Sequence, residues 1–201
     1  MKLSEFRVAK WAADARARSK IIVITASIFS AIACFSVFLH YRTYAFAAIW
    51  HLRCGSRMRV ANHELTIPAH WWVSKDVSSY KAVELIRAHP AHMIPPTITV
   101  APAAWVAQST DKKMAATVRR AVAGMQKLES RQRLSPIHNM AEVVIRSPLG
   151  NFYCEKSSTK LGRTQIDTNL LCFKAGIPYS FSYGGPSYGV REAESILSTF
   201  K

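Results

Sequence analysis

Acidic residues are scarce in this chain of 201 residues, where twelve Asp and Glu stand against twenty-seven Lys and Arg. From Tyr41 onward the sequence holds twenty-one bases and ten acids, which leaves a net charge of about +11. This surplus excludes a strongly acidic surface and favours acidic partners such as anionic lipids, acidic polymers or nucleic acid. The same surplus can serve only to keep the folded part soluble, so both interpretations stay open.

Recognisable catalytic and cofactor motifs are also missing. The four cysteines form neither a C-x-x-C pair nor a zinc-type spacing, which argues against a redox or zinc centre. A phosphate-cradling P-loop and a dinucleotide-binding glycine pattern are both absent. We therefore predict no catalytic residues, no cofactor and no metal site, and we expect that the chain is not an enzyme.

Two short patterns come nearest to chemistry. His89 and His92 have a spacing that can share a metal, but Pro90 breaks the helix that would present them, and no Asp or Glu follows within ten residues. The pattern G-x-S-x-G surrounds Ser187 between an expected strand and an expected helix, as at a nucleophilic serine. No histidine follows Ser187, so we interpret this segment as a Gly/Pro turn and the histidine pair as a loop.

Only one long apolar run is present, over residues 21–39. Its nineteen residues carry no charge, and at about 1.5 Å per residue they span the hydrocarbon of a bilayer as a helix. Tyr41, Tyr44 and Trp50 follow at positions where an aromatic belt would meet the membrane interface. We predict a single transmembrane helix, with the bilayer as the first partner.

The bases that flank this run predict its orientation. Five Lys and Arg lie in the fifteen residues before it and two in the fifteen after it. Cytoplasmic flanks carry the excess of bases, so we place the N-terminus in the cytoplasm and the domain outside the inner (cytoplasmic) membrane. Processing alternatives stay open, because residues 31–33 and 45–47 are A-x-A patterns of the signal-peptidase type and Cys34 ends a loose lipobox.

The remaining patterns predict an α+β domain with an antiparallel sheet flanked by helices. We divide the chain into a basic cytoplasmic N-terminus (1–20), the transmembrane helix (21–39), a juxtamembrane connector (40–62) and an exported domain (63–201). We expect strands from 63 to Pro68 and over 97–101, 142–146, 152–156, 170–174 and 179–183. We expect helices over 77–88, 111–132 and 190–200.

The helix over 111–132 has the clearest pattern, with one apolar and one basic face. Its apolar stripe, which we expect to be core, consists of Met114, Val118, Ala121, Met125 and Leu128. Its basic stripe, which lies largely opposite, consists of Lys112, Arg119, Arg120, Lys127 and Arg131. The basic stripe is either a solvated face or a ridge that binds a polyanion.

Two further pairs are candidate features of the exported part. Cys154 and Cys172 fall in two expected strands, and an oxidising compartment favours a disulfide between them, the alternative being two buried thiols. Trp71 and Trp72 are neighbours in a strand, so one is expected in the core and the other outside. An exposed tryptophan near Tyr80 or Trp105 could bind a sugar or a peptide; the alternative is that the core covers both.

Motifs at both ends of residues 60–201 resemble PsbP-like domains. The segment Leu65-Thr-Ile-Pro-Ala-His-Trp71 is similar to their opening strand, proline and tryptophan, and Glu192-Ala-Glu-Ser-Ile-Leu-Ser-Thr-Phe200 is similar to their terminal helix. The resemblance implies an antiparallel sheet flanked by helices, an adaptor-like role and no catalytic residues.

These observations favour a membrane-anchored, non-enzymatic envelope module that binds a protein or a surface polymer. Nucleic acid is not an expected partner, because an exported domain does not normally meet it. Two alternatives stay open. One is a membrane-proximal polyanion binder that uses the basic helix face, and the other is an enzyme whose site combines His63, Glu64, His70 and Asp76.

Overall fold

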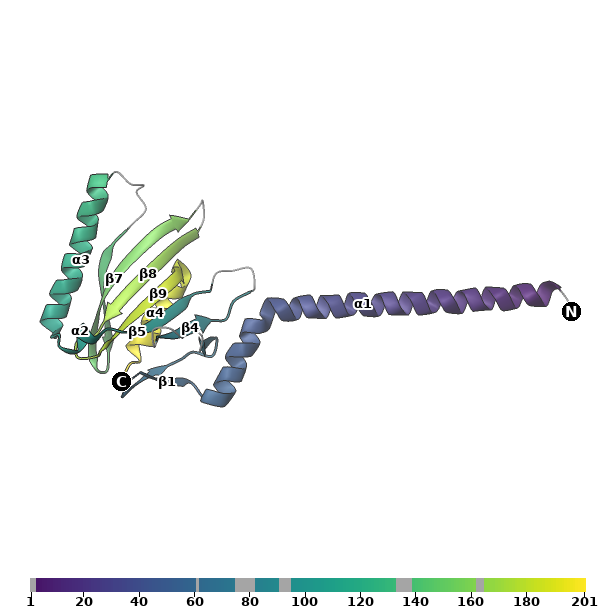
Figure 1. The fold of residues 1–201 in the computed structure, drawn as a ribbon, viewed down its shortest axis with the longest axis horizontal. Coiled ribbons are helices and arrows are strands. Elements are labelled where there is room, and N and C mark those ends of the chain that lie inside the picture. The colour runs from purple at the N-terminus through teal and green to yellow at the C-terminus, as the bar shows by residue number, and fades with distance from the viewer. Residues whose placement is uncertain (1–2, 61, 75–81, 91–94, 133–138, 162–164) are drawn as a thin grey trace. The chain divides into compact units, whose positions relative to one another are not determined.

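The computed structural model describes residues 3–60, 62–74, 82–90, 95–132, 139–161 and 165–201 (Figure 1). The chain divides into two compact units, Met1–Arg42 and Thr43–Lys201. Helix α1 (Leu3–Cys54) starts in the first unit, and its last turns belong to the second. All other helices and strands lie in the second unit, which we call the folded unit.

The apolar part of α1 has its side chains exposed on all sides. Its most apolar eighteen-residue window, within Ile22–Cys54, has a mean hydropathy of 2.4, and none of that window is buried. A helix of a water-soluble domain normally buries one apolar stripe, whereas this helix has no such stripe. By length and composition α1 can cross a membrane, as a membrane anchor or as a signal sequence.

The connector expected over residues 40–62 contains the end of α1, up to Cys54, and a strand over Arg57–Val60. Helix α1 continues to Cys54 because no proline or glycine interrupts it, and strand β1 (Arg57–Val60) follows almost at once. The Thr43 hydroxyl donates to the His89 carbonyl at 2.6 Å and accepts from the His89 amide at 3.0 Å. Compact structure therefore begins at Thr43 and not at the expected residue 63.

The Ala45–Ala47 segment is part of this folded structure. Ala47 is buried, and Phe46 lies against Trp72 with ring centroids 5.7 Å apart. Cleavage after Ala47 would remove the contacts of Thr43 and Phe46.

The folded unit contains a seven-stranded antiparallel sheet in the order β3-β4-β5-β9-β8-β7-β6. Its strands are β3 (Trp71–Ser74), β4 (Val83–Arg87), β5 (Thr97–Pro102), β6 (Ala141–Ser147), β7 (Gly150–Leu161), β8 (Gln165–Phe173) and β9 (Tyr179–Pro186). Strands β1 and β2 (His63–Thr66) form a separate hairpin. The helices are α2 (Ala104–Ala107), α3 (Asp111–Gln132), the 3-10 turn η1 (Ser187–Gly189) and α4 (Val190–Ser198). The predicted α+β class is confirmed.

Helices cover the two faces of the sheet and bury a core on each. On one face, α4 and the β1–β2 hairpin enclose the larger core, where Phe152, Phe181 and Phe200 meet edge to face with centroids 5.3–5.5 Å apart. On the other face, α2 and the start of α3 bury a smaller cluster that includes Val106 and Met114. Residues that alternate along each strand supply the two cores, as the period of two requires.

Two sequence predictions about helices need correction. The expected helix 77–88 is strand β4 in its described part, because Leu85 enters the core while its neighbours Glu84 and Ile86 lie on the opposite face; residues 75–81 lie outside the described residues. Helix α3 has the predicted bounds, but its buried stripe ends at Val122. Met125 and Leu128, expected in the core, are 46% and 50% exposed.

A disulfide joins Cys154 and Cys172, as predicted. The two residues lie directly opposite each other on β7 and β8, with Cα atoms 4.0 Å apart, and both are fully buried in the larger core. Cys34 and Cys54 are free and exposed.

Replacing both Cys154 and Cys172 with alanine should lower the free energy of unfolding by about 3 kcal/mol, because the bond closes a loop of moderate length in the unfolded chain. Urea denaturation of the full chain in detergent, without reductant, measures the change. The Cys34→Ser/Cys54→Ser variant keeps the bond and should unfold like the parent. Equal unfolding midpoints for the parent and the Cys154→Ala/Cys172→Ala variant would contradict the prediction.

Candidate functional site

The carboxylate of Glu192 in α4 is the centre of the most connected polar cluster in the described part of the folded unit. Its Oε2 atom accepts hydrogen bonds from Arg87 Nε at 2.8 Å and Trp71 Nε1 at 3.0 Å, and His70 Nε2 lies 2.9 Å from it. Its Oε1 atom accepts from Arg87 Nη2 at 3.0 Å. Arg87 thus binds both oxygens, a geometry that suits the planar guanidinium.

The electrostatics of this cluster keep Glu192 ionised. Burial raises the pKa of the carboxyl, but hydrogen bonds from Arg87, His70 and Trp71 outweigh burial and lower the pKa to about 2. The hydrogen bond to Glu192 in turn raises the pKa of Arg87, whose guanidinium also lies 5.5 Å from the centre of the Tyr188 ring. A carboxylate held in this state is unsuited to donate a proton near neutral pH, and its evident role is to join α4 to β3 and β4.

The sequence did not indicate this cluster, although it did name His70 as a candidate. In the structure His70 pairs with Glu192, whereas His63 packs its ring against Phe200 at 5.2 Å. Within the described residues, no serine or cysteine shares a hydrogen bond with the His70–Glu192 pair.

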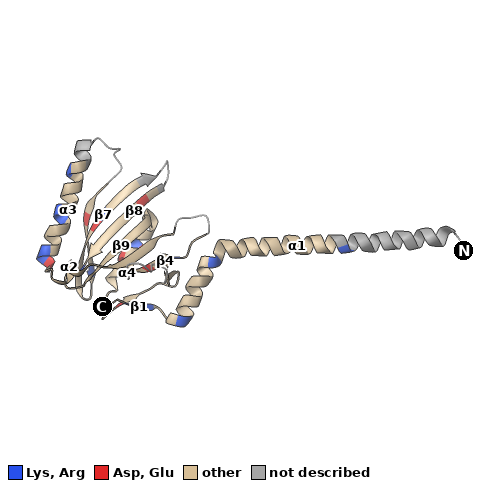
Figure 2. Cartoon of the chain, viewed as in Figure 1, with Lys and Arg blue, Asp and Glu red and all other residues tan. Residues whose placement is uncertain are grey.

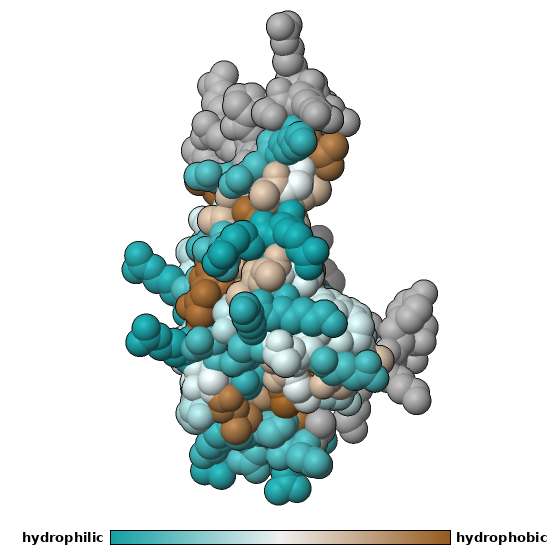
Figure 3. Space-filling model, turned by 90° about the vertical axis from the view of Figure 1, so that its left-hand side faces the viewer, coloured by the Kyte–Doolittle hydropathy of each residue, from teal (hydrophilic) through white to brown (hydrophobic). Residues whose placement is uncertain are grey.

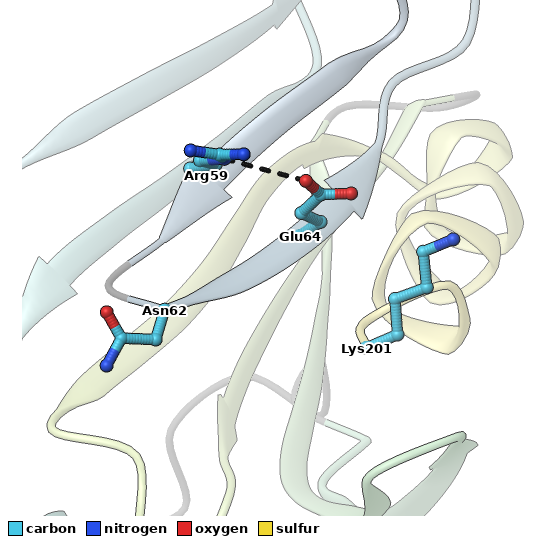
Figure 4. Close-up of a pocket in the computed structure, with 4 residues that line it drawn as sticks. All are labelled: Arg59, Asn62, Glu64 and Lys201. Carbon is cyan, nitrogen blue, oxygen red and sulfur yellow. Dashed lines mark ion pairs between the residues drawn. The ribbon is translucent and has the colours of Figure 1, made fainter.

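Glu64, another residue of the expected enzyme site, lines a polar pocket beside the β1–β2 hairpin (Figure 4). Arg59, Asn62, Glu64 and Lys201 line it, and the Glu64 carboxylate lies 3.5 Å from Arg59 Nε and 3.4 Å from Arg57 Nη1. Glu64 therefore belongs to a surface ion pair. Asp76 lies outside the described residues, and the structure does not bring His63, Glu64 and His70 into one site.

The G-x-S-x-G pattern around Ser187 has a packing explanation. Gly185 has a φ of +142°, and a Cβ atom there would lie 2.9 Å from Pro96 Cα. A Cβ atom at Gly189 would lie 2.5 Å from the Tyr183 hydroxyl, which donates to the carbonyl of Pro186. Both glycines permit close approach of the chain here, which fits the interpretation of the segment as a turn.

Of the two histidines in the spaced pair, His89 is described and His92 lies outside the described residues. His89 Nδ1 is 3.1 Å from the Arg87 carbonyl and the His89 backbone is bound to Thr43. The described residues contain no group of three or more His, Cys, Asp or Glu side chains that could hold a metal ion.

Trp71 and Trp72 point to opposite sides of β3, as expected. Trp71 is fully buried and donates to Glu192. Trp72 is half-buried and lies against Phe46 of α1, whereas Trp105 contacts Phe173 at the end of β8. Phe46 is thus the ring beside Trp72 among the described residues, and Tyr80, the other expected neighbour, lies outside them.

The last turns of α1 cover the β3 edge and form a groove there. His51 Nε2 lies 2.9 Å from the carbonyl oxygens of both Pro68 and Trp71, which fixes α1 to the start of β3. The groove has a volume of about 370 Å³ and is lined by Phe46, Ile49, Trp50, Arg53, Cys54, Trp72 and Val73. Trp72 is one of the residues that the sequence predicts at a binding surface, but no sequence pattern indicates that residues 46–54 fold against it.

The basic face of α3 is a second candidate surface (Figure 2). At 100° per residue, its bases fall within about 120° of the helix circumference, opposite the buried stripe of Met114, Val118 and Val122. The described bases, all exposed, are Lys112, Lys113, Arg119, Arg120 and Lys127; the side chain of Arg131 lies outside the described part. The space-filling view from this side shows hydrophilic side chains projecting over the face, with smaller apolar patches between them (Figure 3).

Arg119 of this basic face lies in an ion pair with Glu142. Arg119 Nε lies 3.2 Å from a Glu142 oxygen, but its side chain is 72% exposed, so the pair contributes little stability. Since α3 packs on β6 and β7 while Trp72 lies on β3, the candidate binding residues form two surfaces near opposite edges of the sheet.

Comparison with known proteins adds one structural likeness. No protein-family model matches the chain, and no curated protein matches its sequence. The solution structure of cyanobacterial PsbP (CyanoP) from Synechocystis sp. PCC 6803 is similar to the chain with a TM-score of 0.41 and 10% sequence identity. The match covers 72% of this chain and 90% of that chain. A similarity of this size does not establish a family.

Replacing Glu192 with glutamine should lower the free energy of unfolding at pH 7 by about 2–3 kcal/mol, because charge-assisted hydrogen bonds are lost. The lowered pKa gives the parent a stabilisation that is complete above the unfolded value near 4.5 and is lost as the pH falls towards about 2. Denaturation midpoints between pH 2 and pH 7 should show this loss in the parent and a weaker one in Glu192→Gln.

The matched control is Glu194→Gln on the same helix, where the carboxylate lies 3.7 Å from Lys156 Nζ in a half-exposed pair. This variant should cost less than about 1 kcal/mol. Equal effects of the two substitutions would contradict a special role for Glu192.

Proposed function

We propose that the chain is a membrane-anchored, non-enzymatic module of the cell envelope. Its folded unit binds an acidic partner, either the acidic surface of a protein or a surface polymer, through the basic face of α3. The observation that carries this proposal is the separation of the two sides of α3. One side is buried against the sheet, and the other presents exposed bases interspersed with small residues such as Ala116 and Ala123.

The distribution of charge on α3 favours a binding role for its basic face and not a merely solvated one. A solvated helix face usually carries both signs of charge, whereas the charged side chains on the described part of this face are all basic. The acid of the first turn, Asp111, lies outside the basic face and suits the positive end of the helix. A concentrated positive potential of this kind attracts polyanions and accelerates their association.

The apolar helix supports the membrane role. Its exposed side chains in residues 22–39 would be costly in water and are favoured in hydrocarbon. The bias of bases towards the N-terminal flank supports a cytoplasmic N-terminus with the folded unit outside, where a disulfide is stable.

The contacts of the polar clusters support a binding role over catalysis. Glu192 is held by three donors, Glu64 by two arginines, and the glycines beside Ser187 by packing. Each of these groups has a structural explanation that needs no substrate.

The topology predicts the behaviour of fusion proteins. A reporter that is active only outside the cytoplasm should work when fused after Lys201 and fail when fused to the N-terminus. The chain should also remain in the membrane fraction after high-salt and carbonate washes, because burial of apolar side chains holds it and not charge. The opposite reporter pattern, or release by carbonate, would contradict the proposed anchoring.

Reversing two charges on α3 should weaken binding to an acidic polymer. The Lys113→Glu/Arg120→Glu variant should bind polygalacturonate about tenfold more weakly than the parent at low salt, and the difference should shrink at high salt through screening. Biolayer interferometry with the full chain in detergent measures both.

The control variant, Arg191→Glu/Lys201→Glu, changes the net charge by the same amount at exposed positions outside α3. It should keep most of the parent's affinity. Equal losses in the two variants would show that net charge alone, and not the face of α3, determines binding.

A further inference from the structure

The two edges of the seven-stranded sheet differ in what lies beside them. Strand β3 is last at one end of the strand order, where His51 of α1 contacts its backbone. Strand β6 is last at the other end and pairs with β7. Edge strands are usually protected by proline, a β-bulge or lysine, whereas β6 contains no proline or lysine and its seven residues pair one to one with β7. Strand β6 therefore has the features of an edge that can accept a further strand.

The hairpin between β6 and β7 determines which residues of β6 face outward. Ser147 and Gly150 are partners across a loop of two residues, and a loop of this length closes on a hydrogen-bonded pair. Hydrogen-bonded and non-hydrogen-bonded pairs alternate along an antiparallel ladder, so the backbone N–H and C=O groups of Glu142, Val144 and Arg146 point away from β7. Within the described residues, no hydrogen bond reaches these outward groups.

The side chains of these three residues form a pattern that is complementary to itself. Val144 is 47% exposed, and residues of opposite charge lie two positions before and after it, Glu142 and Arg146. All three side chains lie on one face of the sheet, because side chains alternate along a strand and Ile145 is buried in the larger core on the other face. When two such strands lie antiparallel with their Val144 residues opposite each other, Glu142 of each strand faces Arg146 of the other.

We propose that β6 pairs with β6 of a second copy of the chain, antiparallel and centred on Val144. Three pairs of outward residues exchange two backbone hydrogen bonds each, about six in all. Two opposite-charge pairs between Glu142 and Arg146 flank the contact between the valines. This charge complementarity favours a second copy over a strand of another protein. The inference rests neither on the proposed anchoring nor on the basic face of α3.

The pairing joins the two sheets into one continuous sheet. Its twofold axis passes between the two Val144 residues and is perpendicular to the sheet, so each face of the sheet stays on its own side. The α3 helices of both copies therefore lie on the same face of the joined sheet.

The ion pair within each chain leaves Glu142 available for this contact. Arg119 Nε lies 3.2 Å from Oε2 of Glu142, and the arginine side chain is 72% exposed, so the pair is weak. The second carboxylate oxygen, Oε1, can accept a hydrogen bond from Arg146 of the second copy.

Charge-reversal variants of the full chain in detergent test the pairing. Glu142→Arg and Arg146→Glu each place like charges opposite each other and should weaken self-association about tenfold. A mixture of the two variants should restore it, because each reversed residue then faces an opposite charge, and so should the double variant Glu142→Arg/Arg146→Glu. Analytical ultracentrifugation measures each variant, and Förster transfer between differently labelled copies measures the mixture.

Three controls separate the edge from other causes. The two single reversals change the net charge in opposite directions, so repulsion between basic copies alone would weaken association in one and strengthen it in the other. Arg119→Gln removes the ion pair within the chain and should leave self-association unchanged. Val144→Pro removes an outward N–H at a position where an edge strand tolerates proline; it should unfold cooperatively in urea like the parent but remain monomeric.

Single cysteines measure the register in a Cys34→Ser/Cys54→Ser background. Val144→Cys should give a disulfide-linked dimer on mild oxidation, because the two copies of this residue lie opposite each other with Cα atoms about 5.5 Å apart. Glu142→Cys should not, because its two copies are offset by four residues, or about 13 Å, along the paired strands.

A parent that stays monomeric at every concentration would overturn the proposal. Self-association that is unchanged in Glu142→Arg and Val144→Pro would overturn it as well, and would place the contact elsewhere, for example on α1. Failure of both the mixture and the double variant to recover association would reject the antiparallel register centred on Val144.

Discussion

The carboxylate of Glu192 is the interaction on which the arrangement of the folded unit depends. It gathers donors from the turn before β3, from β3 and from β4, and so holds α4 against the sheet. A carboxylate partly removed from water is costly unless its lone pairs are satisfied, and here Arg87 satisfies both oxygens. The partners lie 105 to 122 residues away in sequence, so the last helix of the chain must return to its first strands before the cluster exists. That long separation makes the folding of this unit depend on non-local contacts.

Local patterns predicted most of the fold correctly. The bounds of α3, the strands after Pro136 and the terminal helix followed from periodicity and turn residues, and the cysteine pair followed from the placement of two strands. Strand β4 was missed because Val83, Leu85 and Ile86 fit a helical spacing in part. Its pairing with β5 shows that the segment is a strand. The Glu192 cluster and the Phe46–Trp72 contact were missed for the same reason: each depends on segments far apart in the sequence, for which local patterns give no signal.

The groove at the β3 edge and the basic face of α3 share one scaffold without sharing residues. The groove uses β3 at one end of the strand order, and α3 packs on β6 and β7 at the other end. The sheet between them is continuous and antiparallel, and its buried aromatic residues hold both ends in place. The lining of the groove and the basic face of α3 therefore have no side chain in common.

The burial of the disulfide has a consequence for the order of events as the protein matures. Both sulfur-bearing residues are sealed in the core beneath α4 and the rings of Phe152 and Phe181. Thiol–disulfide exchange requires an attacking thiolate to reach a sulfur atom, so neither oxidant nor isomerase can act once this core has closed. Oxidation must precede or accompany the closing of α4 over β7 and β8. Once formed, the bond between Cys154 and Cys172 therefore persists in the folded chain, because a reductant cannot reach either sulfur atom.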